Sequence, residues 1–113
     1  MPTDNRPPLR GIPARIDSSR HDLVAEFRSH PFGRHSADLQ ALLDYMRGGP
    51  IPGSYFLWMV EPHTKWVLAR FTESEPLRAE RLDEFVFHDI IAAEWHVFRA
   101  RWKEIFGVEL EDA

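Results

Sequence analysis

The stretch YFLWMVEPHTKWVLARF, residues 55–71, decides the fold of this chain. It holds two apolar and aromatic runs, residues 55–60 and 66–71, joined by a connection that includes Pro62. Short runs of aromatic and β-branched residues separated by turn-forming residues predict a β-hairpin. Because both faces of the first run are apolar, we expect that strand to be covered on both sides.

Helical signals precede the hairpin. A first short helix is expected to end near Ser29, because Pro31 disfavours helical geometry at the residue before it. Asp17, Ser18 and Ser19 carry side-chain oxygens that could cap the start of this helix. The chain is therefore expected to enter the domain through a helix of about three turns.

A second helix is expected between Ser36, which serves as its N-cap, and Arg47. Its apolar residues recur at the i, i+3, i+4, i+7 spacing of one helix face. These residues are Leu39, Leu42, Leu43 and Met46.

The clearest amphipathic helix is expected over residues 89–106, where Gly107 provides the signal for its end. Its apolar stripe steps by four and three residues, through Ile91, Trp95, Phe98, Trp102 and Ile105. Residues 72–83 read as a polar linker, and residues 84–87 as a possible third strand. The predicted fold class is α+β, with two short N-terminal helices, a small antiparallel sheet and a long C-terminal amphipathic helix.

The length of 113 residues leaves room for one domain. Residues 1–17 contain four prolines and little apolar periodicity, so we assign them to a Pro-rich extended arm. Residues 18–113 are assigned to a single α+β domain.

The composition excludes several classes of protein. With 14 Lys and Arg against 18 Asp and Glu, a net charge of −4, the chain lacks the basic footprint of a nucleic-acid-binding protein. No apolar run approaches the ~20 residues of a membrane span. The absence of cysteine excludes a disulfide scaffold and Cys-ligated metals, and it fits a cytoplasmic protein.

Histidines and one glutamate are the candidates for chemistry. His88 and His96 are eight residues apart, farther than the i, i+3 or i, i+4 spacing by which one helix supplies two metal ligands. We therefore expect no metal ligands in this chain. Glu94 lies beside the aromatic stripe, where partial desolvation is typical of a general acid; alternatively, it pairs with Arg99 or Arg101. A small-molecule-binding protein or small enzyme that uses Glu94 with His88 or His96 thus stays open.

The aromatic load favours an interaction subunit. The chain has 8 Phe, 4 Trp and 2 Tyr, more large rings than one small core comfortably hides. Aromatic residues are enriched at the centres of protein interfaces. The candidate interface residues are Tyr55, Trp58, Trp66, Trp95 and Trp102. A homo-oligomer that covers the sheet with a second copy of the chain is a further possibility.

An ordered series of short motifs resembles a known family. The series begins with the turn His30, Pro31, Phe32 and Gly33, and it continues through Ser36, Leu39-Gln40, Tyr45, Arg47 and Gly53-Ser54-Tyr55. In this order the motifs resemble the small (light) subunit of bacterial N,N-dimethylformamidase, over about residues 21–106. The chain departs from the family pattern at His30, which stands where the family has Asn, and it has two fewer residues between Gly33 and Ser36.

The resemblance implies a specific division of labour. In that enzyme the large subunit hydrolyses the linear amide C–N bond of the formamide at a mononuclear iron held by tyrosine and carboxylate ligands. The small subunit packs against the large one in an α2β2 assembly, and it carries no catalytic, cofactor-binding or metal residues. The leading hypothesis is therefore a non-catalytic small subunit that stabilises a large catalytic subunit.

Overall fold

The computed structural model describes residues 12–47 and 53–110, so most of the predicted arm lies outside the described residues. The elements in chain order are α1 (His21–Ser29), α2 (Ala37–Met46), β1 (Tyr55–Glu61), β2 (Lys65–Phe71), β3 (Ala79–Phe87) and α3 (Ile90–Phe106). This is the predicted α+β fold, and the hairpin, both N-terminal helices and the long C-terminal helix are confirmed.

The three strands form one antiparallel sheet in the order β1-β2-β3. The third strand begins at Ala79, so the prediction of a polar linker over residues 72–83 was wrong for its last five residues. Strand β3 lies at an edge and is mostly exposed, so its charged side chains project into solvent while its backbone pairs with β2. Because residues 79–83 are mostly polar, their pairing with β2 could not be recognised from the sequence.

A bulge interrupts β3. Val67 lies opposite Val86, but the next residue of β2, Leu68, lies opposite Leu82. Residues 83–85 are therefore additional residues on the β3 side of the ladder. Such bulges bend the bulged strand and increase its local twist.

Register decides which side chains share a face of the sheet. Residues that pair across strands point to the same side, and their sequence neighbours point to the other. Leu57, Leu68 and Leu82 share the face that looks toward α3, because Leu68 and Leu82 line a cavity together with Ala100 of α3. We call the opposite face the outer sheet face. Its residues are Phe56, Trp58, Val67, Ala69, Phe71, Ala79, Arg81 and Val86. At the start of β1, Phe56 and Phe71 also line a cavity together with Met46 of α2 and Arg101 of α3.

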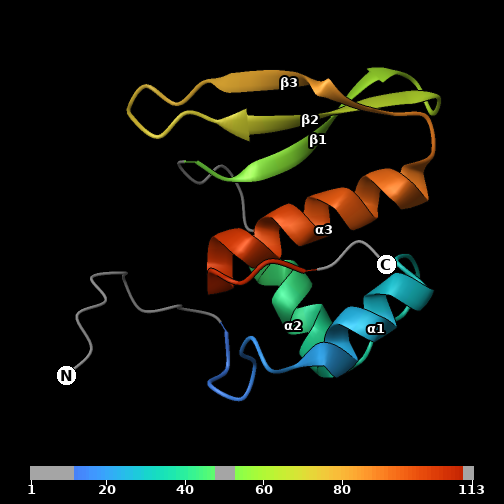
Figure 1. Cartoon of the computed structure of the whole chain (residues 1–113), viewed down its shortest axis with the longest axis vertical. Helices are drawn as coiled ribbons and strands as arrows, with labels where there is room; N and C mark the ends of the chain where they lie inside the picture. Colours follow the sequence, from blue (N-terminus) through green and yellow to red (C-terminus); the bar gives the residue numbers. More distant parts are fainter. Residues whose placement is uncertain (1–11, 48–52, 111–113) are drawn as a thin grey trace.

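Helix α3 is the central element of the fold. Figure 1 shows it between the sheet and the pair α1 and α2. The buried cluster on its helical side draws on Leu23 and Phe27 of α1, and Phe98 and Trp102 of α3. The other buried members of this cluster are Ile16, Leu39, Leu42, Leu43, Met46 and Leu110. None of the described helices is long and apolar enough to cross a membrane.

The burial of α3 differs in part from the predicted stripe. Phe98 and Trp102 are buried as expected, but Ile91 is 52% exposed. Ala93 and Val97, which lie outside the stripe, are fully buried. The reason is that α3 packs on two sides, so a second line of small apolar residues is buried in addition to the aromatic one.

The predicted cap of α2 is confirmed, whereas that of α1 was wrong. The Ser36 side chain accepts a hydrogen bond from the Leu39 backbone N–H at 3.3 Å. At α1 the N-cap residue is Arg20, which makes no side-chain capping bond. Asp17 instead accepts hydrogen bonds from the backbone N–H and hydroxyl of Ser19, closing a local turn before the helix.

The described end of the predicted arm is packed on the domain. Ile16 belongs to the buried cluster, and Ile12 packs against it. The Ile16 backbone N–H donates to Pro13 O at 2.9 Å, so the chain turns here. The folded part therefore begins before residue 18.

Candidate interaction surfaces

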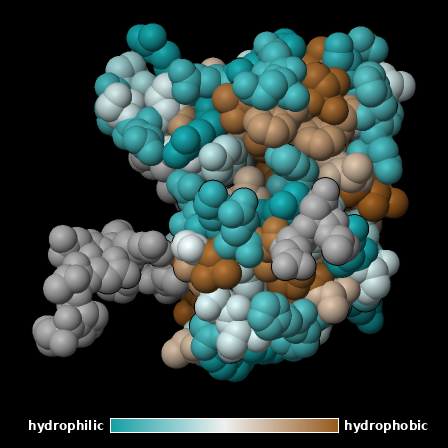
Figure 2. Space-filling view, in the orientation of Figure 1, coloured by the Kyte–Doolittle hydropathy of each residue, from teal (hydrophilic) through white to brown (hydrophobic). Residues whose placement is uncertain are grey.

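The outer sheet face presents apolar side chains to solvent. Trp58 is 37% exposed and its cross-strand neighbour across β2, Val86, is 41% exposed. Phe56 and Phe71 are half-buried. Figure 2 shows apolar atoms reaching the surface in the upper part of the molecule, where Figure 1 places the sheet. A strand that was expected to be covered on both sides thus keeps apolar side chains in contact with solvent.

The aromatic rings of the outer sheet face stack on one another. The Phe56 ring centroid lies 4.6 Å from that of Phe71 and 6.5 Å from that of Trp58, and both pairs are stacked. The Arg81 guanidinium lies 5.8 Å from the Trp58 ring centroid. Val67, in the central strand beneath these rings, is fully buried. The face is therefore a formed surface whose rings hold one another in place.

The five candidate interface residues lie in different surroundings. Trp58 is on the outer sheet face, and Tyr55 and Trp95 are half-buried. Trp66 is buried, and Trp102 is 0% exposed within the helical core. The indole N–H of Trp102 has no hydrogen-bond partner among the described residues. Trp66 and Trp102 are thus occupied inside the chain, and Trp58 is the tryptophan that offers most surface.

The turn of residues 30–33 lies at the end of α1. Gly33 has a φ of +97°, a backbone conformation that residues with a Cβ atom rarely adopt. The His35 Nε2–H donates to His30 O at 2.9 Å, and the two imidazole rings stack 5.5 Å apart. Phe32 projects into solvent at the apex of the turn.

A groove connects this turn to α3. It has a volume of about 450 Å³ and is lined by Pro31, Trp95 and Arg28, among others. The Arg28 guanidinium lies 4.3 Å from the Trp95 ring centroid. The turn and one candidate interface tryptophan, 64 residues apart in sequence, therefore meet at one groove.

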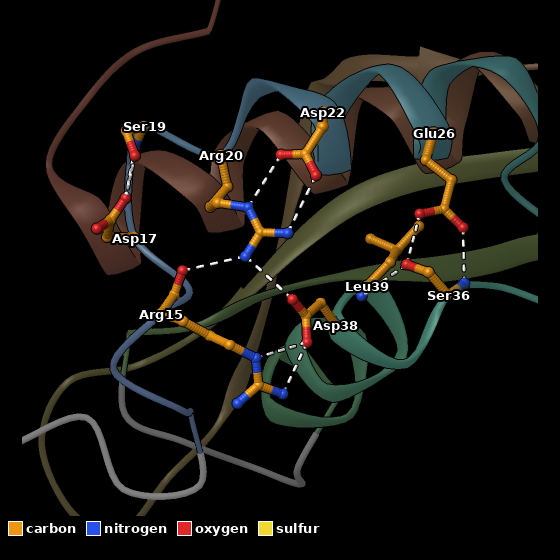
Figure 3. Close-up of polar contacts among 9 residues, drawn as sticks. All are labelled: Arg15, Asp17, Ser19, Arg20, Asp22, Glu26, Ser36, Asp38 and Leu39. Atoms are coloured by element: carbon orange, nitrogen blue, oxygen red, sulfur yellow. Dashed lines mark hydrogen bonds and ion pairs between the residues drawn. The ribbon is translucent and has the colours of Figure 1, made fainter.

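Glu26 joins α1 to the start of α2. Its two carboxylate oxygens accept hydrogen bonds from the Ser36 backbone N–H at 2.7 Å and from the Ser36 hydroxyl at 2.6 Å (Figure 3). These hydrogen bonds hold the pKa of Glu26 below its ordinary value, and the bond from the Ser36 hydroxyl has the larger effect. Since Ser36 also caps α2, this contact fixes both ends of the turn.

A second polar cluster ties the arm to the same two helices. The Asp38 carboxylate accepts hydrogen bonds from Arg15 at 2.9 Å and from Arg20 at 3.0 Å (Figure 3). The Arg15 and Arg20 hydrogen bonds hold the pKa of Asp38 below its ordinary value. Arg20 also contacts Asp22 at 3.0 Å. These contacts account for the packing of residues 15–20 against α2.

The structure separates the residues of the alternative chemical site. The Glu94 carboxylate lies 3.8 Å from Arg47 Nη2, and it also interacts electrostatically with Arg101, one of its two predicted partners. The His96 ring lies 5.1 Å from the rings of both Phe85 and Phe87. His88 Nδ1 is 3.1 Å from Thr64 O. These contacts of Glu94, His88 and His96 thus go to different residues, and His88 precedes α3.

Sequence reasoning missed several residues of the interaction surfaces. Val86 was placed in a possible strand without an assigned face, and the pairing of Trp58 with Val67 and Val86 was not foreseen. The apolar residues Phe85, Val86 and Phe87 indicated a strand, but the bulge in β3 shifts the register, so their faces could not be assigned from the sequence. Within residues 12–47 and 53–110, no group of three or more His, Asp or Glu residues is arranged to hold a metal ion.

Comparison with known proteins identifies one family. Residues 11–112 match the family model described as N,N-dimethylformamidase alpha subunit. No curated protein and no solved structure matches the chain. The matched span covers almost the whole sequence, including the turn of residues 30–33, the hairpin and α3. This chain therefore belongs to the N,N-dimethylformamidase alpha subunit family.

Proposed function

We propose that this chain is the non-catalytic small subunit of an amide-hydrolysing complex, where it stabilises a large catalytic subunit. The observation that carries the proposal is the outer sheet face, an ordered apolar surface centred on Trp58 in a chain of a subunit family. A subunit contributes most when it buries apolar surface that is costly to leave in water.

The expected energetic gain is large enough to hold a complex together. Fully burying one large apolar side chain contributes about 1.5–3 kcal/mol. The outer sheet face offers Trp58, Val86 and the accessible parts of Phe56 and Phe71. Because the rings already stack on one another, little side-chain entropy remains to be lost on binding.

The chemistry belongs to the partner in this proposal. The large subunit holds the mononuclear iron and hydrolyses the linear amide C–N bond, in an α2β2 assembly located in the cytoplasm. The family assignment and the separation of Glu94 from His88 and His96 both support this division.

The proposed experiment removes the indole ring of Trp58 from the outer sheet face without disrupting strand β1. Trp58→Thr deletes the indole but retains a residue that favours β-structure. Val108→Thr is the matched control, since Val108 is an exposed apolar residue after α3. Each variant is co-expressed with the large subunit, and the affinity of the two chains is measured.

We expect Trp58→Thr to weaken the complex by at least about 30-fold, the effect of a tryptophan hot spot, and Val108→Thr to leave it unchanged. Equal affinity for both variants would contradict the assignment of the outer sheet face. A stable monomer with no affinity for a large subunit would overturn the proposed function. If the unmutated chain forms a homodimer that Trp58→Thr abolishes, the partner of the outer sheet face is a second copy of the chain and not a large subunit.

A further inference from the structure

Two arginines converge on a small cavity between the end of α2, the start of β1 and α3. The cavity has a volume of about 310 Å³, and its lining includes Arg47, Arg101, Ser54 and Tyr55. Arg101 is half-buried, and its Nε–H donates to Tyr55 O at 3.0 Å. Among the described residues this is the one hydrogen bond of its guanidinium, so the terminal N–H groups have no acceptor there.

Among the residues that the structure describes, the charge of this cavity is not balanced. Glu94 is the carboxylate that acts on Arg101, and Arg47 is the second cation. Two guanidinium groups therefore face one carboxylate. The 3.8 Å between Arg47 Nη2 and Glu94 Oε2 is longer than the roughly 2.7–2.9 Å of a charge-assisted hydrogen bond.

Burial makes this excess charge costly. Removal from water lowers the pKa of Arg101. The attraction of Glu94 offsets part of this loss, and the weaker repulsion of Arg47 adds to it. Guanidinium stays protonated at neutral pH, so the charge persists and favours a further anion. The segment that joins Arg47 to Gly53 reads Gly-Gly-Pro-Ile-Pro and contains no acidic residue.

We propose that Arg47 and Arg101 form a carboxylate-binding site at this cavity. The planar fork of arginine matches the two oxygens of a carboxylate, which a guanidinium binds through two parallel N–H···O bonds. The apolar walls contributed by Met46, Phe56 and Phe71 reduce the competition from water and strengthen the pairing. The cavity volume admits a formate-sized or acetate-sized group.

Two sources can supply this carboxylate, an acidic side chain of the large subunit or a small free acid such as formate. The first source deepens the proposed function and rests on it, whereas the second does not. The test therefore has two arms that use the same variants.

Arg47→Gln is the diagnostic variant, because the Arg47 guanidinium contacts Glu94 and its loss spares the Arg101 bond to Tyr55. Arg78→Gln is the matched control, since Arg78 lies exposed in the loop between β2 and β3. Arg101→Lys is the second variant, which keeps the charge but not the fork.

In the first arm, the full chain labelled with ¹⁵N is titrated with sodium formate, against sodium chloride at equal ionic strength. If formate binds at this site, the Arg101 Nε–H signal shifts in a saturable way during the titration. We expect Arg47→Gln to weaken the affinity for formate at least about 10-fold. In the second arm, the affinity for the large subunit is measured. A protein carboxylate gives a loss of about 10-fold or more in Arg47→Gln and Arg101→Lys, with Arg78→Gln unchanged.

A response in either arm supports the site and names its source. No formate response together with unchanged affinity in both variants would overturn it. If the unmutated chain binds no large subunit, the proposed function fails, and the formate arm alone decides the site. In that case a saturable, Arg47-dependent shift supports the site, and its absence refutes it.

Discussion

The helical half and the sheet half of this molecule use aromatic residues in opposite ways. Between α1 and α3 the Phe27 and Phe98 rings stack 4.3 Å apart in a fully buried core. On the outer sheet face the stacked rings of Phe56 and Trp58 remain accessible to solvent. The helical half is closed by the chain itself, whereas the outer sheet face is ordered but open to solvent.

The position of α3 explains this difference. One helix packs its aromatic residues against α1 and α2 and its small residues against the sheet. It does not fill the space on the sheet side, where a cavity of about 630 Å³ remains between β2, β3 and α3. A single central helix can complete one core in a chain of this length, but it cannot also cover both faces of a sheet.

The largest effect is expected in the helical half. Phe98→Ala should destabilise the chain by about 4 kcal/mol, because it removes a fully buried ring and leaves a cavity. Phe85→Ala is the matched change in the sheet half, where the ring is 39% exposed, and it should cost less than half as much. Chemical denaturation of the two variants measures this ratio. Equal losses would show that the two halves are equally closed.

An intermediate effect is expected where α1 meets α2. Glu26→Gln should cost about 1 kcal/mol, since a neutral amide accepts less strongly from the Ser36 hydroxyl and backbone N–H. Glu84→Gln, at an exposed position of β3, is the control and should leave stability unchanged within about 0.5 kcal/mol. An equal loss in both variants would mean that the Ser36 contact contributes nothing.

The same contact predicts a dependence on acid. The pKa of Glu26 is held below its ordinary value of 4.5 by Ser36, so the folded chain binds this proton more weakly than the unfolded chain. Its stabilisation is complete above pH 4.5 and is lost as pH falls through the lowered folded pKa. The stability difference between the unmodified chain and Glu26→Gln should therefore shrink in acid. A difference that grows on acidification would reverse the assigned sign.

The smallest effect is expected at the exposed positions of the outer sheet face. Val86→Thr should change the stability of the isolated chain by no more than about 0.5 kcal/mol, because Val86 is exposed and threonine keeps the β-branch. Val67→Thr, at the buried cross-strand neighbour, should cost about 1–3 kcal/mol. Thermal unfolding tests the pair, and a large loss in Val86→Thr would mean that the chain itself covers this face.

The elements of the fold were predictable because local patterns specify them. The i, i+3, i+4, i+7 spacing from Leu39 to Met46 and the oxygen of Ser36 both act within a few residues of chain. The start of β3 was not predictable, because Ala79 to Asp83 carry no apolar alternation and are extended through pairing with β2. The α1 cap failed for a related reason, since Asp17 bonded to Ser19 before the helix began.

The candidate surfaces were predictable in kind but not in detail. Aromatic excess indicated an interface, yet composition could not distinguish Trp58 from Trp102, which differ only in what packs over them. The meeting of Arg47 with Glu94, and of Arg101 with Tyr55, joins residues 46 or 47 positions apart. Such contacts depend on where α3 lies relative to the end of α2 and the start of β1, which no local pattern encodes.

Within the described residues, the order β1-β2-β3 leaves two edge strands, β1 and β3, and they are not alike. The β3 edge carries Glu80, Arg81, Asp83 and Glu84 and is bent by its bulge, devices that discourage a further strand from adding. The β1 edge has no charge between Tyr55 and Val60. If the chain is a subunit as proposed, a copy synthesised without a partner exposes a template for pairing with other copies. We expect cells that make the chain in excess to accumulate it as aggregates, so that in the proposed complex the production of the two subunits would have to be matched.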